Sequence, residues 1–348
     1  MYNPATSAGK TNGRTRRKGS GGVTLSEVAR LAGVSAITIS RALNTPDRVS
    51  ADTLVRVREA VARTGYVPNL LAGGLASNRT RLVAALIPTI AGSVFLETVQ
   101  ALTDTLAAKN YQLMLGQSGY NGSREDALID AIVGRRPDGI VLTGIMHSAQ
   151  GRRRLLASGI PVVETWDLTP TPIDMLVGFS HEKVGAQAAL WLHRRGYRRP
   201  AIVTAGDHRA ALRRAGFEAR MHELGIRKVP ACVVESPSTL GNGRAGLLDV
   251  LASDARIDAI FCSSDVLAHG AIIEAQAQGL EVPGHLAVMG FGNLGFAADT
   301  HPALTTVHVD GAAIGAQAAN FIIDRVEGRD PGPKVRDIGF SIIGRASA

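Results

Sequence analysis

From Leu82 onward, short apolar runs alternate with longer stretches in which apolar residues recur every three or four positions. Apolar strands that alternate with helices predict doubly wound parallel sheets. Two such series predict two lobes, with a ligand cleft beyond the carboxyl ends of the strands. In the first series, strands are expected at 82–88, 111–116, 139–144 and 160–164, and helices at 94–109, 123–134 and 149–158. In the second, strands are expected near 200–205, 231–235, 258–262 and 286–290, and helices near 183–195, 211–224, 241–252 and 265–278.

The preceding part of the chain has a different pattern, which predicts three short helices around a small core. Thr24 and Glu27 can form a capping box at the start of the first helix, and Gly33 permits the positive φ that ends it. The next two helices begin after serine caps: Ser35 before residues 36–43, and Ser50 before residues 51–64, which Gly65 stops.

Two short helices separated by a tight glycine turn have the layout of a helix-turn-helix. On the second helix, the core side is expected to hold Val34, Ile39, Ala42 and Leu43. An outward isoleucine beside an arginine suits the major groove, where apolar groups contact thymine methyls, arginine bonds guanine or phosphate, and hydroxyls bond phosphates. The residues expected to contact DNA are Thr24, Ser35, Ala36, Ile37, Thr38, Ser40, Arg41 and Asn44.

The charge distribution indicates a polyanionic partner for this first domain. Residues 1–81 carry 13 lysines and arginines against 4 acidic residues, whereas residues 82–348 carry 25 against 26. A local basic excess is typical of nucleic-acid binding, because neutralised phosphates release condensed counterions. Residues 1–22 are basic and rich in Gly, Ser and Thr, so we expect a disordered tail and no secretory signal.

Cysteine usage and hydropathy exclude several classes of protein. Cys232 and Cys262 have no CxxC spacing and no ligating neighbours in sequence, so neither a metal site nor a disulfide framework is indicated. No stretch approaches the roughly 18 consecutive apolar residues of a membrane span. We expect a cytoplasmic protein with no membrane association, no metal and no cofactor.

The segment VTLSEVARLAGVSAITISRALNTPDRVS at 23–50, followed by GYVPN at 65–69, resembles the lactose/galactose repressor (LacI/GalR) family. The resemblance continues along nearly the whole chain. It implies a transcriptional regulator, in the family's usual arrangement a repressor, that binds a palindromic operator as a homodimer. It also implies a hinge helix at 70–76, which folds on DNA and wedges Leu75 between base pairs. Gly73 and Gly74 cost that helix about 2 kcal/mol relative to alanine.

The resemblance also implies a domain plan and a fold. The helix-turn-helix domain is expected at 23–68, the hinge and linker at 69–81, and an effector-binding and dimerisation domain at 82–346. The last resembles the periplasmic sugar-binding proteins, whose two lobes exchange chain segments near 179, 308 and 338 and close on a ligand. The fold class expected is therefore α/β with an N-terminal all-α domain.

Candidate effector contacts lie at the carboxyl ends of the expected strands. Arg213 opens an RxxGF motif whose first arginine contacts the effector across the family, and a guanidinium can grip a carboxylate through two parallel bonds. Ser264 and Asp265 match the family's Asn-Asp pair, although Asp265 could equally cap the following helix. The remaining candidates are Ser93, Phe95, His147, Glu164, Trp166 and Asn293.

One departure from the family suggests the class of effector. The family usually carries an aspartate after the strand near 290, whereas this chain has Gly292 and Asn293. Loss of that negative charge favours an anionic ligand over a neutral sugar. Within the family the chain resembles the repressors of gluconate utilisation, which implies gluconate, 2-ketogluconate or 6-phosphogluconate as effector. Arg213 would then pair with the carboxylate, while Asp265, His147 and Glu164 would bind hydroxyls.

Other functions remain to be weighed against a sugar-acid repressor. A regulator of the same family could respond to a neutral sugar or a nucleoside. An enzyme with a DNA-binding appendage is disfavoured, because the sequence has no Gly-rich phosphate loop, nucleophile elbow or metal-ligand cluster. A periplasmic receptor would require a signal peptide, and an architectural DNA binder would not require so large a second domain.

Overall fold

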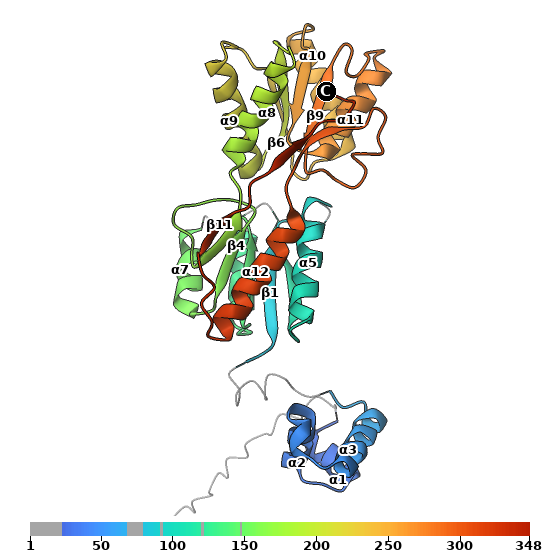
Figure 1. The fold of residues 1–348 in the computed structure, drawn as a ribbon, viewed down its shortest axis with the longest axis vertical. Helices are drawn as coiled ribbons and strands as arrows, with labels where there is room; N and C mark the ends of the chain where they lie inside the picture. Colours follow the sequence, from blue (N-terminus) through green and yellow to red (C-terminus); the bar gives the residue numbers. More distant parts are fainter. Residues whose placement is uncertain (1–22, 68–78, 91–92, 120–121, 147) are drawn as a thin grey trace, which may run out of the picture. The chain divides into compact units, whose positions relative to one another are not determined.

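The computed structural model describes residues 23–67, 79–90, 93–119, 122–146 and 148–348, without the side chains of residues 93, 122 and 123. The chain divides into two compact units, Met1–Asn78 and Arg79–Ala348 (Figure 1). None of the described helices is long and apolar enough to cross a membrane.

The first unit consists of short helices around one small core. Val28, Ile39 and Val57, one from each of the three α-helices within residues 23–67, are almost fully buried together. The elements are α1 (Leu25–Ala32), α2 (Ala36–Asn44), the 3₁₀ turn η1 (Pro46–Arg48) and α3 (Ala51–Thr64).

The local signals that start and stop these helices operate as expected, with one exception. The Thr24 backbone N–H donates to Glu27 Oε2 over 2.7 Å, and the Glu27 N–H donates to Thr24 Oγ1 over 3.3 Å, which completes the capping box. Gly33 ends α1 with a φ of 66°. The exception is Ser50, whose hydroxyl donates to the Thr53 hydroxyl over 2.9 Å and does not cap α3.

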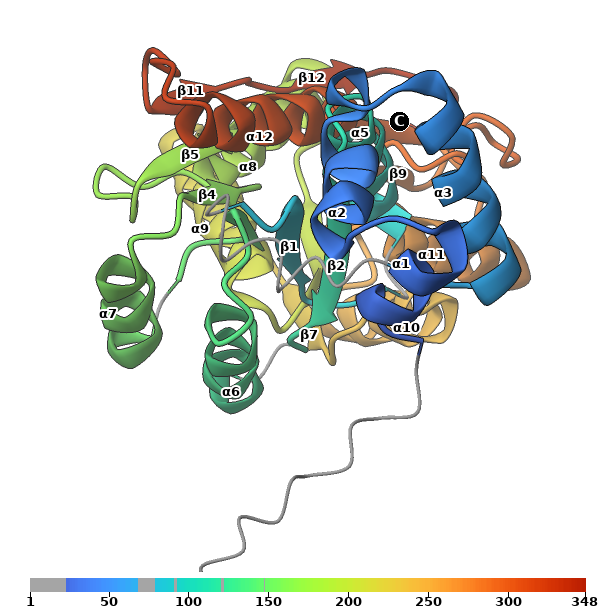
Figure 2. The same ribbon diagram turned by 90° about the horizontal axis from the view of Figure 1, so that it is seen from below.

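The described part of the second unit forms two six-stranded sheets, each covered by helices on both faces. The first lobe has strand order β11-β5-β4-β3-β1-β2, and all its strand pairs are parallel. Its strands are β1 (Leu82–Ile87), β2 (Gln112–Gln117), β3 (Gly139–Thr143), β4 (Val162–Thr165), β5 (Met175–Gly178) and β11 (Val335–Asp337). Its helices are η2 (Ser93–Phe95), α5 (Leu96–Ala107), α6 (Gly122–Val133), α7 (Ala149–Ser158) and α12 (Gly311–Val326). Figure 2 shows α6 and α7 on one side of this sheet and α5 and α12 on the other.

The second lobe has strand order β12-β10-β9-β8-β6-β7, in which only the short β12 runs antiparallel to its neighbour, β10. The chain passes between the lobes after β5, after β10 and between β11 and β12. Its strands are β6 (Pro200–Ala205), β7 (Ala231–Val234), β8 (Ala259–Cys262), β9 (Ala287–Phe291), β10 (Thr305–His308) and β12 (Ser341–Ile343). Its helices are α8 (His181–Arg194), α9 (His208–Glu223), α10 (Leu240–Ser253) and α11 (Asp265–Ala277).

Glycines allow pairs of helices in this unit to approach until their backbones touch. A β-carbon at Gly185 of α8 would overlap the Arg213 carbonyl of α9, and one at Gly216 of α9 would overlap the Glu182 carbonyl of α8. A β-carbon at Gly315 of α12 would likewise overlap a backbone carbonyl of α5. These contacts fix α9 and α5, whose N-terminal ends lie at a cavity of this unit.

Candidate functional site

The outward face of α2 in the first unit combines an apolar tip with polar groups. Ile37 is 65% exposed, and Ser40 and Arg41 beside it are also exposed. Ala36, also expected to contact DNA, is only half exposed, because it packs against the small core. The face therefore presents an isoleucine, a guanidinium and a hydroxyl together, a combination suited to major-groove contacts.

Several of the polar residues expected to contact DNA also stabilise the helix ends. Ser35 Oγ accepts from the Thr38 N–H over 3.1 Å and lies 2.9 Å from the Thr38 hydroxyl. Asn44 Nδ2 donates to the Ser40 carbonyl over 2.9 Å. Thr24 belongs to the capping box of α1, and Leu75 lies outside the described residues. These hydrogen bonds stabilise α2. The polar groups that form them keep lone pairs and exposed surface, which remain accessible to a binding partner.

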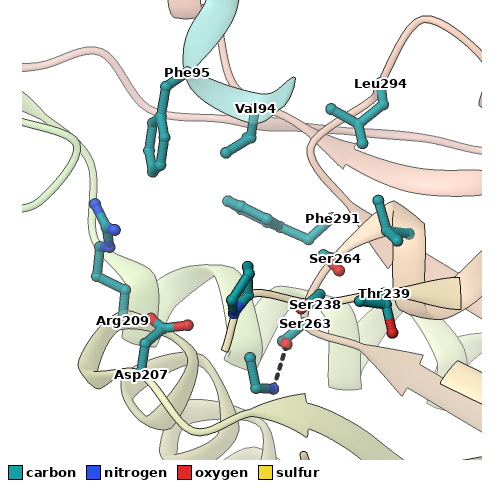
Figure 3. Close-up of a pocket in the computed structure, with 13 residues that line it drawn as sticks. Val94, Phe95, Asp207, Arg209, Ser238, Thr239, Ser263, Ser264, Phe291 and Leu294 are labelled. Carbon is teal, nitrogen blue, oxygen red and sulfur yellow. Dashed lines mark hydrogen bonds between the residues drawn. The ribbon is translucent and has the colours of Figure 1, made fainter. Parts of the chain in front are cut away.

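A cavity of about 320 Å³ opens between the two lobes of the second unit (Figure 3). The first lobe contributes Val94 and Phe95, which immediately precede α5. The second lobe contributes residues at or beyond the carboxyl ends of its strands, as expected for a doubly wound sheet: Ala205, Asp207, Arg209, Pro237, Ser238, Thr239, Ser263, Ser264, Val266, Phe291 and Leu294. Of the residues expected from sequence to bind an effector, Phe95 and Ser264 line this cavity.

Arg209, in the first turn of α9, is the cationic residue of the cavity wall, and no sequence motif pointed to it. Its guanidinium carbon lies 5.0 Å from the centre of the Phe95 ring of the other lobe. Its Nη1 atom is buried and has no hydrogen-bond partner among the described residues. Arg209 and Asp207 also border a second, more polar cavity of about 210 Å³. A buried guanidinium N–H that lacks an acceptor is suited to an anionic ligand.

Arg213, one helical turn further along α9, lies behind the cavity wall. It is only 6% exposed, and Nη2 donates to the Ser263 carbonyl over 3.1 Å. Its guanidinium carbon lies 4.2 Å from the centre of the Phe291 ring. Because Ser263 and Phe291 both line the cavity, Arg213 supports the wall rather than forming it, in contrast to the direct contact expected from the motif.

His181 connects Arg213 to the first lobe through a chain of buried hydrogen bonds. Arg213 Nη1 donates to His181 Nδ1 over 2.9 Å, so the ring proton is on Nε2, which donates to the Trp166 carbonyl over 2.9 Å. Burial, followed by the charges of Arg213 and Arg209, holds the pKa of His181 well below its usual value. The imidazole is therefore neutral at pH 7.

Trp166 continues this chain into the first lobe. Its Nε1–H donates to Thr98 Oγ1 over 3.0 Å, and the Thr98 hydroxyl donates to the Gly311 carbonyl over 2.8 Å. Trp166 is buried between Phe95 and Phe179 and does not line the cavity. Its position links α5, the start of α12 and the wall of the second lobe.

Asp265 is fully buried beneath the cavity wall, and Ser264 is the residue that caps α11. Oδ1 accepts from the Thr306 hydroxyl over 2.5 Å, and Oδ2 accepts from the Leu294 N–H over 2.7 Å. Burial raises the pKa of this carboxyl to about 6, although these hydrogen bonds oppose the shift. Asp265 thus fixes the loop that carries Leu294 to the cavity, and the cap role weighed from the sequence falls to Ser264.

The raised pKa of Asp265 predicts a pH-dependent stability difference from Asp265→Asn. The folded state binds this proton more tightly than the unfolded state, whose pKa is near 3.8, so the carboxyl's contribution falls as pH rises through about 6. We expect the free energy of unfolding of the wild type, relative to the variant, to decrease by about 1 kcal/mol between roughly pH 5 and 7.5. Urea unfolding at both pH values measures it. A difference that is constant or grows with pH would contradict this assignment.

The remaining candidates either do not line the cavity or lie outside the described atoms. Both Glu164 oxygens accept backbone N–H groups, from Met146 over 3.0 Å and from Ile173 over 2.8 Å, so this buried carboxylate fixes two loops. Asn293 Oδ1 accepts from Arg345 Nη2 over 2.8 Å. His147 and the side chain of Ser93 are not among the described positions.

The chain is similar to characterised proteins over almost its whole length. Residues 24–69 match the profile of the bacterial regulatory proteins of the lacI family, and residues 190–348 match that of the periplasmic binding protein-like domain. The HTH-type transcriptional regulator GntR of Pseudomonas aeruginosa is 36% identical over 93% of this chain and 95% of its own length. GntR of Escherichia coli K12 is 30% identical over 91% of this chain and 96% of its own length.

A solved structure carries the same resemblance. The crystal structure of a LacI-family transcriptional regulator from Silicibacter pomeroyi matches with a TM-score of 0.87 and 32% identity, over 93% of this chain and 99% of that chain. The fold class and family expected from the sequence are confirmed. The chain belongs to the lacI family of bacterial regulatory proteins and is a DNA-binding transcriptional regulator, not an enzyme.

Proposed function

We propose that this regulator is a repressor whose operator affinity is lowered by a sugar acid bound between the lobes. The observation that carries the proposal is the buried Arg209 Nη1, which has no hydrogen-bond acceptor among the described residues and borders a cavity of about 320 Å³. Cavities from about 300 Å³ are typical of small-molecule sites. Gluconate, 2-ketogluconate and 6-phosphogluconate are the candidate effectors, because the sequence resembles the repressors of gluconate utilisation. The relatives named GntR are consistent with that resemblance.

In this proposal the two ends of the ligand contact different kinds of side chain. Arg209 would hold the carboxylate through charge-assisted hydrogen bonds, which are stronger than bonds between neutral groups. The hydroxyls of Ser238, Thr239 and Ser264, which line the same cavity, would bind hydroxyls of the sugar chain. Phe95 and Val94 of the first lobe would cover the ligand, so its binding would draw the lobes together.

The expected dimer requires a face that a second copy can cover. Strands β2 and β7 are the outer strands of their sheets, and each carries an exposed apolar residue. The exposed apolar residues on these strands and on α5 and α10 are Leu96, Leu115, Val233, Leu240 and Leu248. We propose that a second copy of the chain packs on these residues, which would give two helix-turn-helix units for a palindromic operator.

Fluorescence anisotropy on an operator from the protein's own promoter region, at fixed salt, tests the effector. We expect at least one of the three acids to weaken operator binding. Arg209→Ala should still bind operator but should bind that acid on the order of 10²-fold more weakly, because a charge-assisted bidentate contact is lost. Calorimetric titration measures the ligand affinity directly.

Arg214→Ala is the matched control, since Arg214 is on the same helix but forms an ion pair with Glu218 over 2.7 Å. It should retain the wild-type response. If no sugar acid changes operator affinity, the sugar-acid assignment fails, and neutral sugars and nucleosides become the candidates. If Arg209→Ala responds as the wild type does, the ligand is sensed elsewhere.

A further inference from the structure

The second unit begins with a short segment that is bonded tightly to the body of the first lobe. One carboxylate, Asp138, accepts three hydrogen bonds from it: from the Thr80 N–H over 2.7 Å, the Thr80 hydroxyl over 2.9 Å and the Arg81 N–H over 2.9 Å. The Asp138 N–H in turn donates to the Leu82 carbonyl over 2.7 Å. The backbone at residues 80–82 is therefore fixed in both position and direction.

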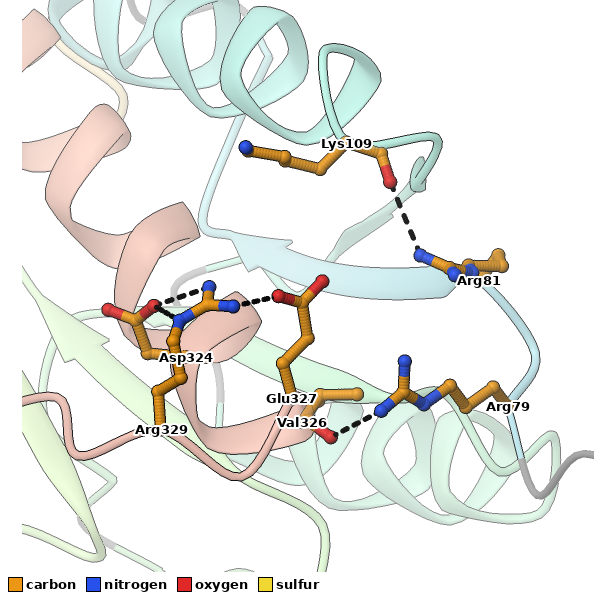
Figure 4. Close-up of polar contacts among 7 residues, drawn as sticks. All are labelled: Arg79, Arg81, Lys109, Asp324, Val326, Glu327 and Arg329. Atoms are coloured by element: carbon orange, nitrogen blue, oxygen red, sulfur yellow. Dashed lines mark hydrogen bonds and ion pairs between the residues drawn. The ribbon is translucent and has the colours of Figure 1, made fainter.

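The two arginines that flank Thr80 reach the carboxyl ends of two different helices (Figure 4). Arg79 Nη2 donates to the carbonyl of Val326, the last residue of α12, over 3.1 Å. Arg81 Nη1 donates to the carbonyl of Lys109, just beyond α5, over 3.3 Å. The last carbonyls of a helix lack partners within it and carry partial negative charge, which makes them natural acceptors for arginine. We call Arg79, Thr80, Arg81 and Asp138 the linker clasp.

The opposite ends of the same two helices lie at the effector cavity. Phe95, which lines the cavity, is the N-cap residue of α5. The Thr98 hydroxyl of α5 donates to the Gly311 carbonyl at the start of α12 over 2.8 Å. Gly315 lets the two helix backbones touch, so α5 and α12 are packed as one pair from the cavity to the clasp.

We propose that Arg79 and Arg81 are positioning residues, which set the direction in which the chain leaves the second unit toward the helix-turn-helix. In a dimer they would hold the two DNA-binding units at one separation. A displacement of α5 and α12 at the cavity would reach the linker through the same contacts. The proposal rests on the dimer proposed above, but it does not depend on which effector binds.

The spacing of operator half-sites gives a test that uses the full-length protein without any ligand. Two tethered binding units gain affinity only when the tether lets both engage together. We expect the wild type to bind a palindromic operator on the order of 10-fold or more tightly than the same operator with one or two base pairs inserted at its centre. The double variant Arg79→Ala/Arg81→Ala should discriminate between these spacings by less than about threefold, because a freer linker tolerates each of them.

Three controls make the result specific to positioning. Arg329→Ala removes an arginine that bonds to Asp324 and Glu327 at the same end of α12 but makes no hydrogen bond to the clasp among the described residues, so it should discriminate as the wild type does. Arg79→Lys/Arg81→Lys retains both charges and should recover part of the discrimination. A duplex with a single half-site should bind all the variants equally.

Two outcomes would overturn the proposal. In one, the alanine double variant keeps the wild-type preference for the native spacing. In the other, it loses affinity equally on every duplex, including the single half-site, which indicates damage to the DNA-binding unit. Sedimentation of the same samples identifies a failure of the dimer, and the absence of ligand separates this test from the sugar-acid assignment.

Discussion

Ile37→Asp is expected to reduce operator affinity by on the order of 10³-fold, to the level of non-specific DNA binding. Ile37 is 65% exposed at the outward face of α2, where it is not needed for the core of the first unit. In a major groove an aspartate would lose the apolar contact with thymine and bring a negative charge toward the phosphates. Fluorescence anisotropy at one fixed salt concentration measures the loss.

Val55→Asp is the matched control for this experiment. Val55 is 53% exposed on α3 of the same unit, so the substitution makes the same chemical change at a comparably exposed site. Both variants should unfold at the wild-type temperature, and Val55→Asp should bind operator within a few-fold of the wild type. Equal losses of operator affinity in the two variants would show that negative charge anywhere on the unit weakens binding. They would contradict the assignment of α2 as the helix that contacts the bases.

The sequence was most informative where a structural signal is local. The capping box at Thr24 and the glycine turn at Gly33 each depend on residues within four positions of one another, so they could be predicted without knowing the fold. The alternation of apolar runs with helical patterns was sufficient to predict the doubly wound class, because a buried parallel strand can be recognised from its own continuous apolar run.

Elements stabilised mainly by tertiary contacts were not predicted. The helix α12 is rich in alanine and glycine, with Gly315 at the contact with α5, so its pattern of large apolar residues is weak. Strands β11 and β12 have three residues each, the residues of β11 are all exposed, and β12 has only two apolar residues, so neither contains a long apolar run. Both are strands only because an edge of a sheet is available to pair with them.

The candidate site shows the same division between local and distant information. The RxxGF motif pointed to α9, where a single turn separates Arg213, which supports the wall, from Arg209, which borders the cavity. Nothing near Asp265 in the sequence reveals that Thr306 and the Leu294 N–H occupy its two oxygens. Whether a carboxylate is available to a ligand depends on such distant partners, and these appear only in the folded chain.

Gly185→Ala is expected to destabilise the second unit by more than about 3 kcal/mol, although alanine normally favours a helix over glycine by about 1 kcal/mol. The added β-carbon would overlap the Arg213 carbonyl and the Phe217 N–H of α9, and these are backbone atoms that cannot rotate away. The two helices must therefore separate, which opens voids in the surrounding core. Urea unfolding measures the loss of stability.

Gly241→Ala provides the control, because Gly241 is an exposed position in the first turn of α10, where the nearest atom to an added β-carbon is Thr239 Oγ1 at 3.8 Å. That variant should be stabilised by about 0.5–1 kcal/mol. If both variants gained stability, α8 and α9 would not be in backbone contact. Since α9 carries both Arg209 and Arg213, its displacement in Gly185→Ala should also weaken the binding of the effector in whatever fraction remains folded.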